Sequence, residues 1–135
     1  MEWLESFELR VPEIDGDHRA ILALMKAVRA AAGRGNRERV DHYLDRLFDL
    51  CRDHFAREEA LMTRWGYPEA AVHAVYHRRL LERAQAVRTA CAMIDSPDEF
   101  ESCCEELMTF LVDDVVRGDM KMKSFLEDAG LMIPS

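Results

Sequence analysis

The 135-residue chain is predicted to fold as an all-α, up-down-up-down four-helix bundle. Apolar residues recur at helical spacing in four long segments. Most of the four prolines and six glycines fall between these segments, where they interrupt helices. The connections are short, so neighbouring helices must run antiparallel. A chain of this length can bury a full core, and residues 1–135 are interpreted as one domain.

Each helix has its own start and stop signals. The first is expected from about residue 15 to 33, because Asp15 and Asp17 precede an apolar stripe and Gly33 opens a turn. The second should span residues 37–64, where apolar residues keep helical spacing. The third should begin at Pro68, a first-turn position that tolerates proline, and run to about residue 94. Ser-Pro-Asp-Glu at residues 96–99 is a capping-box pattern, so the fourth helix should cover about residues 97–117.

Composition excludes several classes of partner. The net charge of −8 would repel phosphate backbones and anionic lipid surfaces, so nucleic acid is not an expected partner. The start of the chain lacks the basic segment of a secretory signal, and the longest apolar run, residues 20–25, is too short to span a bilayer. We therefore expect a cytoplasmic protein without membrane contact.

The four cysteines are expected to be reduced thiols that pack as small apolar side chains. They form no CxxC pair, and the adjacent Cys103 and Cys104 are poorly placed to bridge each other within a helix. The same interpretation is given to Cys51 and Cys91.

Two pairs of polar residues at helical spacing indicate a metal site. His54 and Glu58 are four apart in the second helix, and His73 and His77 are four apart in the third. One such pair alone could be a solvated helix face. Helix rise, however, places Glu58 about 9 Å before the intervening turn and the two histidines about 7 to 14 Å after it. The pairs therefore lie at one depth, and imidazole with carboxylate suits iron.

The other two helices bring further candidate ligands to the same layer. The start of the first helix and the end of the fourth lie at that end of the bundle, where the chain has His18, Asp114 and Asp119. Glu58 and Asp119 each offer two oxygens and could bridge two metals, with imidazoles in terminal positions. The fifth histidine, His42, lies about 18 Å along the second helix from the ligand pair and is expected at the surface.

Joint ligation by Asp114 and Asp119 requires a break in the fourth helix. Residues five apart point about 140° away from each other in a regular helix. An interruption is therefore expected near Gly118, followed by a short C-terminal helix at residues 119–129 that ends at Gly130. An unbroken helix would remove one of the two aspartates from the site.

These residues lie in motifs that resemble those of the hemerythrin family, specifically its single-domain bacterial members. I-D-G-D-H ending at His18 resembles I-D-x-x-H, H-F-A-R-E-E at residues 54–59 matches H-F-x-x-E-E, and residues 73–77 match H-x-x-x-H. The likeness covers nearly the whole chain, and Trp3 lies in a segment that resembles the family's N-terminal arm. It implies a non-haem, oxo- or hydroxo-bridged pair of iron ions. By resemblance, the ligand roles fall on His18, His54, Glu58, His73, His77 and Asp119.

The fourth family motif departs from its pattern. W-L-x-x-H-I-x-x-x-D aligns with F-L-V-D-D-V-V-R-G-D at residues 110–119, which has Asp114 in place of histidine and Phe110 in place of tryptophan. Leu111 would line the oxygen pocket by resemblance, or serve as a core leucine. A carboxylate at residue 114 would add negative charge beside the iron that binds oxygen in the family, which favours the ferric state and autoxidation. Its shorter side chain could also leave the metal with an open position.

The sequence therefore predicts a non-haem di-iron protein that binds or senses dioxygen, or a similar small diatomic or peroxide ligand. An enzyme that reduces peroxide, oxygen or nitric oxide is an alternative, because the altered ligand opens the iron. A bundle that binds zinc or no metal and acts as an interaction module is another. The interpretation favours an oxygen-binding protein over an enzyme, and the sequence does not indicate a redox partner or an oligomeric state.

Overall fold

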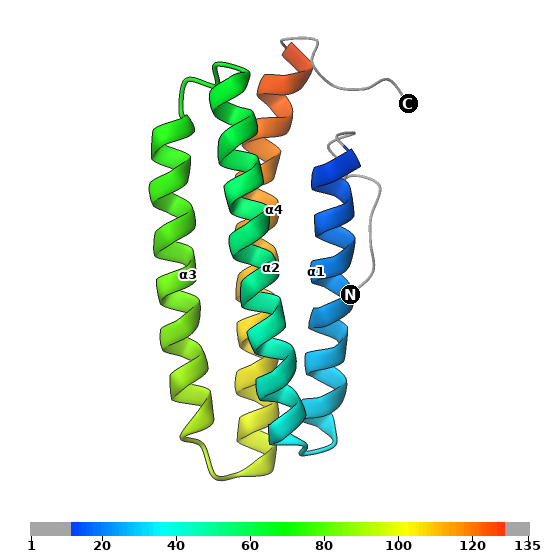
Figure 1. Ribbon diagram of the computed structural model, residues 1–135. Helices are drawn as coiled ribbons and strands as arrows, with labels where there is room; N and C mark the ends of the chain where they lie inside the picture. The colour runs from blue at the N-terminus through cyan, green and yellow to red at the C-terminus, as the bar shows by residue number, and fades with distance from the viewer. Residues whose placement is uncertain (1–11, 129–135) are drawn as a thin grey trace.

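The computed structural model describes the backbone of residues 12–128 and the side chains of residues 16–113. This part of the chain forms α1 (Pro12–Gly33), α2 (Arg37–Arg64), α3 (Ala70–Ala92) and α4 (Pro97–Asp128), and contains no strand. Consecutive helices run antiparallel, and α1 packs against α4 to close the bundle (Figure 1). The predicted all-α, up-down-up-down four-helix bundle is confirmed. The predicted N-terminal arm, with Trp3, lies outside the described residues.

The first two turns end their helices in the same way. After α1, the amides of Gly35 and Asn36 donate to the carbonyls of Ala32 and Ala31, each at 3.0 Å. After α2, Gly66 and Tyr67 repeat the pattern with the carbonyls of Thr63 and Met62. Both glycines have positive φ, 69° and 70°, the left-handed conformation that this helix-ending motif requires. The two turns therefore reverse the chain within a few residues and keep the helices adjacent.

The connection between α3 and α4 is held by one cap and one side chain from another helix. The Ser96 hydroxyl accepts from the amide of Glu99 at 3.4 Å, in line with the predicted capping box. The Arg37 guanidinium, at the start of α2, donates to the carbonyl of Ile94 at 2.5 Å. The α3–α4 connection is thus tied to the α1–α2 turn at the same end of the bundle.

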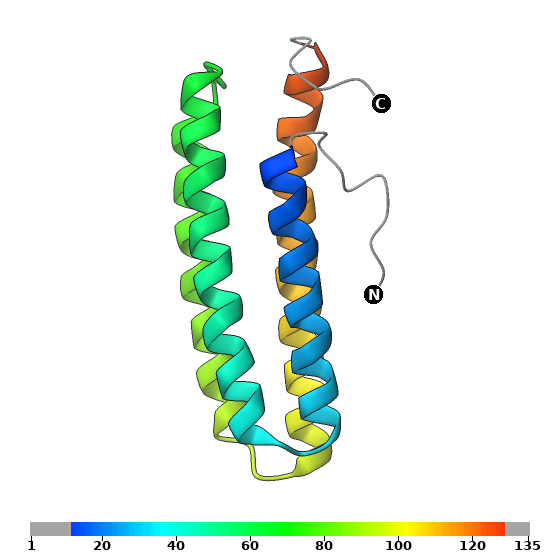
Figure 2. The same cartoon turned by 45° about the vertical axis from the view of Figure 1, so that its right-hand side comes forward.

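An apolar core runs between the four helices. Figure 2 shows these helices as two pairs, with α2 and α3 beside α1 and α4. The largest fully buried apolar side chains come from α1, α2 and α4. They are Met25, Leu47, Phe48, Met62, Leu107, Met108 and Leu111. Toward the α2–α3 turn the buried face of α2 becomes polar, because His54 and Glu58 occupy positions that apolar residues hold elsewhere in the helix. None of the described helices is both long enough and apolar enough to cross a bilayer.

The predicted break in the fourth helix is wrong. α4 continues from Pro97 to Asp128 through Gly118, so residues 119–128 are part of it and not a separate helix. A single internal glycine costs only about 1 kcal/mol relative to alanine, which does not end a helix 32 residues long. The geometric reason for placing both Asp114 and Asp119 in one site depended on that break. The side chains of these two aspartates lie outside the described residues.

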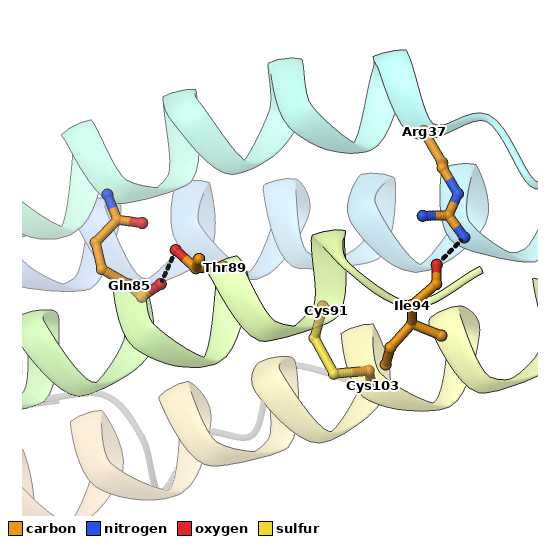
Figure 3. The surroundings of a disulfide bond; sticks show 6 residues. All are labelled: Arg37, Gln85, Thr89, Cys91, Ile94 and Cys103. Carbon is orange, nitrogen blue, oxygen red and sulfur yellow. Dashed lines mark hydrogen bonds between the residues drawn. A yellow bond between two sulfur atoms is a disulfide. The ribbon is translucent and has the colours of Figure 1, made fainter. Parts of the chain in front are cut away.

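The prediction of four reduced cysteines is also wrong. Cys91 near the end of α3 and Cys103 in α4 form a disulfide, with their Cα atoms 5.6 Å apart (Figure 3). This separation lies within the range that a disulfide spans. Adjacent cysteines within one helix cannot bridge each other, but this bridge joins cysteines of two helices. Cys51 and Cys104 are free and buried, as expected.

Candidate metal centre

Five buried polar side chains gather at the end of the bundle that holds the α2–α3 turn. They are the buried polar and charged residues among the described side chains, and the most exposed of them retains only 7% of its accessible surface. α1 supplies one histidine, α2 a histidine and a glutamate, and α3 two histidines. The five are His18, His54, Glu58, His73 and His77. Burying so many polar groups is costly unless they bind one another, a proton or a cation.

The donor atoms of these residues converge on Glu58. One Glu58 oxygen, Oε1, lies 3.3 Å from Nε2 of His54 and 3.4 Å from Nε2 of His77. The Nε2 atoms of His18 and His54 are 3.2 Å apart. The rings of His73 and His77 meet edge to face with their centroids 4.4 Å apart. Imidazoles from three helices therefore surround one carboxylate.

Two groups of three possible metal ligands result, and they share Glu58. His18, His54 and Glu58 form the first group, and Glu58, His73 and His77 form the second. Within each group the donor atoms lie within 4.8 Å of one another, so a single cation could contact all three. A carboxylate that belongs to both groups is placed to bridge two cations.

Each group has an outer carboxylate that holds one histidine by its other ring nitrogen. Oδ2 of Asp17 lies 3.1 Å from Nδ1 of His54, and Oε2 of Glu59 lies 3.2 Å from Nδ1 of His77. A carboxylate accepts, so each Nδ1 donates. The Phe55 ring also stacks on His77 with the centroids 3.9 Å apart, which fixes the plane of that imidazole.

The two outer carboxylates differ in electrostatic environment. Arg57 donates from two nitrogens to Asp17, at 2.7 and 2.9 Å. Burial by itself would raise the pKa of Asp17, but the hydrogen bonds and charges of His54 and Arg57 outweigh it and hold that pKa below its ordinary value. Burial raises the pKa of Glu59, and the charge of Arg78 only partly opposes this. The first group thus has a neutralised outer carboxylate, and the second does not.

This arrangement suits metal cations. When Nδ1 of a neutral imidazole donates to an outer carboxylate, Nε2 carries a lone pair. The Nε2 lone pairs of His54 and His77 are then directed toward an oxygen of Glu58, which also only accepts. A cation between these acceptors resolves the conflict, and outer carboxylates commonly orient metal-binding histidines in this way. The donor set of imidazoles and carboxylate is one that iron accepts.

The structure brings together five of the seven residues that the sequence singled out. Asp114 and Asp119 are the other two, and their side chains are not among those described. His42 is exposed on α2, as predicted. Asp17 and Glu59 were not predicted to belong to the site, although each directly adjoins a predicted ligand in a quoted motif. Leu111 is fully buried and belongs to the apolar core cluster.

Residues 10–126 match the family described as the Hemerythrin HHE cation binding domain. The chain belongs to the hemerythrin family. The chain is 30% identical to a bacteriohemerythrin of Stenotrophomonas maltophilia over 86 residues, which cover 64% of this chain and 56% of that protein. A bacteriohemerythrin of Methylococcus capsulatus is 32% identical over 82 residues, 60% of this chain and 63% of that relative. The matched segments thus cover less than two thirds of either relative, and the buried histidine–glutamate cluster lies inside the region assigned to the hemerythrin family.

Proposed function

We propose that this hemerythrin-family protein is a non-haem di-iron protein that binds or senses dioxygen. The observation that carries the proposal is the sharing of Glu58 by two groups of buried donors. His18 and His54 would hold one iron, His73 and His77 the other, and Glu58 would bridge them. Asp119 would be the second bridging carboxylate by its place in the fourth family motif. Both relatives named above are bacteriohemerythrins.

The protein's own residues would position the iron pair and keep water from it. Asp17 and Glu59 fix the tautomers of His54 and His77, so that Nε2 of each faces the metals. Full burial of His54 and Glu58 keeps the centre in a low-dielectric environment, where charge interactions are strong. When bound, an iron pair supplies the electrons that dioxygen takes up.

The unequal outer carboxylates would make the two groups unequal as metal ligands. Glu59 carries a charge that no bidentate arginine neutralises among the described residues, whereas Asp17 is paired with Arg57. A charged acceptor on Nδ1 makes an imidazole a stronger donor to its metal. Glu59 would therefore make His77 a stronger donor to its metal than Asp17 makes His54.

Anaerobic loading with Fe²⁺ followed by oxygen titration tests this function. An absorption band should develop on oxygenation and disappear when oxygen is removed. If the protein does not bind iron, or if the iron-loaded protein shows no oxygen-dependent band, the proposal of oxygen binding is overturned. Turnover of peroxide or nitric oxide without a reversible band would instead support the reductase alternative, which Asp114 suggests by replacing a family histidine.

A further inference from the structure

A second chemically active feature lies at the opposite end of the bundle from the histidines. The Cys91–Cys103 disulfide joins the last turn of α3 to the second turn of α4 (Figure 3). Cys91 lies 14 residues beyond His77 in the same helix, about 21 Å along its axis. The disulfide is therefore separate from the candidate metal centre.

The two sulfurs differ in their access to solvent. Cys91 is buried, with 3% of its surface exposed. Cys103 is partly exposed and lines a shallow groove of about 330 Å³ between the end of α3 and the start of α4. A small molecule that enters this groove meets Cys103 first. Attack on the disulfide from solvent should consequently occur at the Cys103 sulfur.

The groove is acidic. Asp98, Glu99 and Glu106 contribute carboxylates to its lining, and none of the described residues that line it is basic. The groove therefore repels a thiol that carries a carboxylate and attracts one that carries an ammonium group. Ile94 forms part of the wall, and its carbonyl accepts from Arg37, a contact that does not depend on the disulfide.

We propose that Cys91–Cys103 is a thiol–disulfide exchange site that takes electrons from thiols bearing a positive charge near the sulfur. The incoming thiolate bonds to Sγ of Cys103, the bond to Cys91 breaks, and Cys91 leaves as a thiolate that takes up a proton. A second thiol then attacks the mixed disulfide and releases Cys103. The protein disulfide gains two electrons, and the two reagent thiols are oxidised to one disulfide.

The remaining cysteines do not compete in this exchange. Cys104 follows Cys103 in sequence but is 2% exposed, and burial raises the pKa of its thiol. Cys51 is fully buried, and burial raises its pKa to about 12. Neither thiol is poised to attack, so they serve as internal references for reactivity in the folded protein.

The test uses the full chain and two small thiols of opposite charge, cysteamine and 3-mercaptopropionate. Samples taken during the reaction are quenched by alkylation. Mass spectrometry then measures the rate at which the disulfide is reduced and identifies the cysteine that carries the mixed disulfide. The adduct should form on Cys103. The ratio of the cysteamine rate to the mercaptopropionate rate should fall about tenfold in Glu99→Gln/Glu106→Gln at low ionic strength, and high salt should reduce the difference between the proteins. Comparing the ratio between proteins cancels the intrinsic reactivities of the thiols.

A matched control removes two charges elsewhere. Glu38→Gln/Glu82→Gln changes exposed carboxylates of α2 and α3 outside the groove and should leave the ratio at the wild-type value. The proposal is overturned if the adduct forms on Cys91 or if both double variants behave alike. It is equally overturned if Cys91 and Cys103 are alkylated in the air-oxidised protein without reductant, because no exchangeable bond would then exist.

Discussion

The two ends of the bundle bury different chemistry on the same four helices. At the α2–α3 turn, polar side chains from three helices converge on Glu58. At the other end a covalent bond joins α3 to α4 beside the apolar core. Buried polar groups stabilise a fold only when they are fully paired, whereas a disulfide stabilises it mainly by restricting the unfolded chain. Metal binding should therefore depend on one end of the bundle, while the disulfide stabilises the fold from the other end.

The largest expected effect is at the shared carboxylate. Glu58→Ala should remove most of the bound metal, because both donor groups lose a ligand and two nearby cations lose the charge between them. Metal analysis of protein loaded with iron and then desalted measures the loss. Asp53→Ala, which truncates an exposed carboxylate on the same helix, is the control and should keep its iron. Near-full iron in Glu58→Ala would mean that the bridge lies elsewhere.

At the disulfide end, a variant should lose stability but keep its iron. Cys91→Ala/Cys103→Ala should lower stability by about 3 kcal/mol, or roughly 10 °C in Tm, because the bridge closes a loop across a sequence separation of 12. Its iron content should equal that of wild type. Calorimetry and metal analysis of the same sample check both statements. A variant that lost iron in proportion to its stability would show that the two ends are coupled.

Smaller effects should distinguish the two halves of the metal end. Asp17→Asn and Glu59→Gln should each weaken binding of one cation by roughly tenfold, because each loses the charged acceptor that orients one histidine. Competition with a coloured chelator measures the affinities. Asp17→Asn should also reduce stability more, since it breaks the ion pair with Arg57. Unchanged affinities in both variants would reduce the outer carboxylates to structural contacts.

The smallest expected effect is at residue 114, where the chain has aspartate in place of the histidine of the fourth family motif. Asp114→His removes a negative charge and restores the family residue, so autoxidation of the oxygenated, iron-loaded protein should slow several-fold. Absorbance decay in air, at equal iron loading, gives the rate for each protein. Equal rates would mean that residue 114 does not tune the centre.

Local signals in the sequence predicted the turns between the helices well, because glycine turns and the Ser96 cap act within a few residues. Gly118, in contrast, wrongly predicted an early end of the fourth helix. Helical spacing and antiparallel topology together placed five site residues at one depth. The disulfide escaped prediction because it depends on the relative register of α3 and α4, which no local pattern encodes. The roles of Asp17 and Glu59 were missed because, in the sequence, a carboxylate beside a metal ligand cannot be distinguished from a solvent-exposed carboxylate. Only the structure shows the histidine nitrogen that each one contacts.

Anomalous diffraction from iron-loaded crystals tests the two-metal centre most directly, because it locates each iron without reference to activity. Two peaks should flank Glu58, one near His18 and His54 and the other near His73 and His77. A single peak, or peaks distant from Glu58, would contradict a bridged iron pair at the α2–α3 end of the bundle.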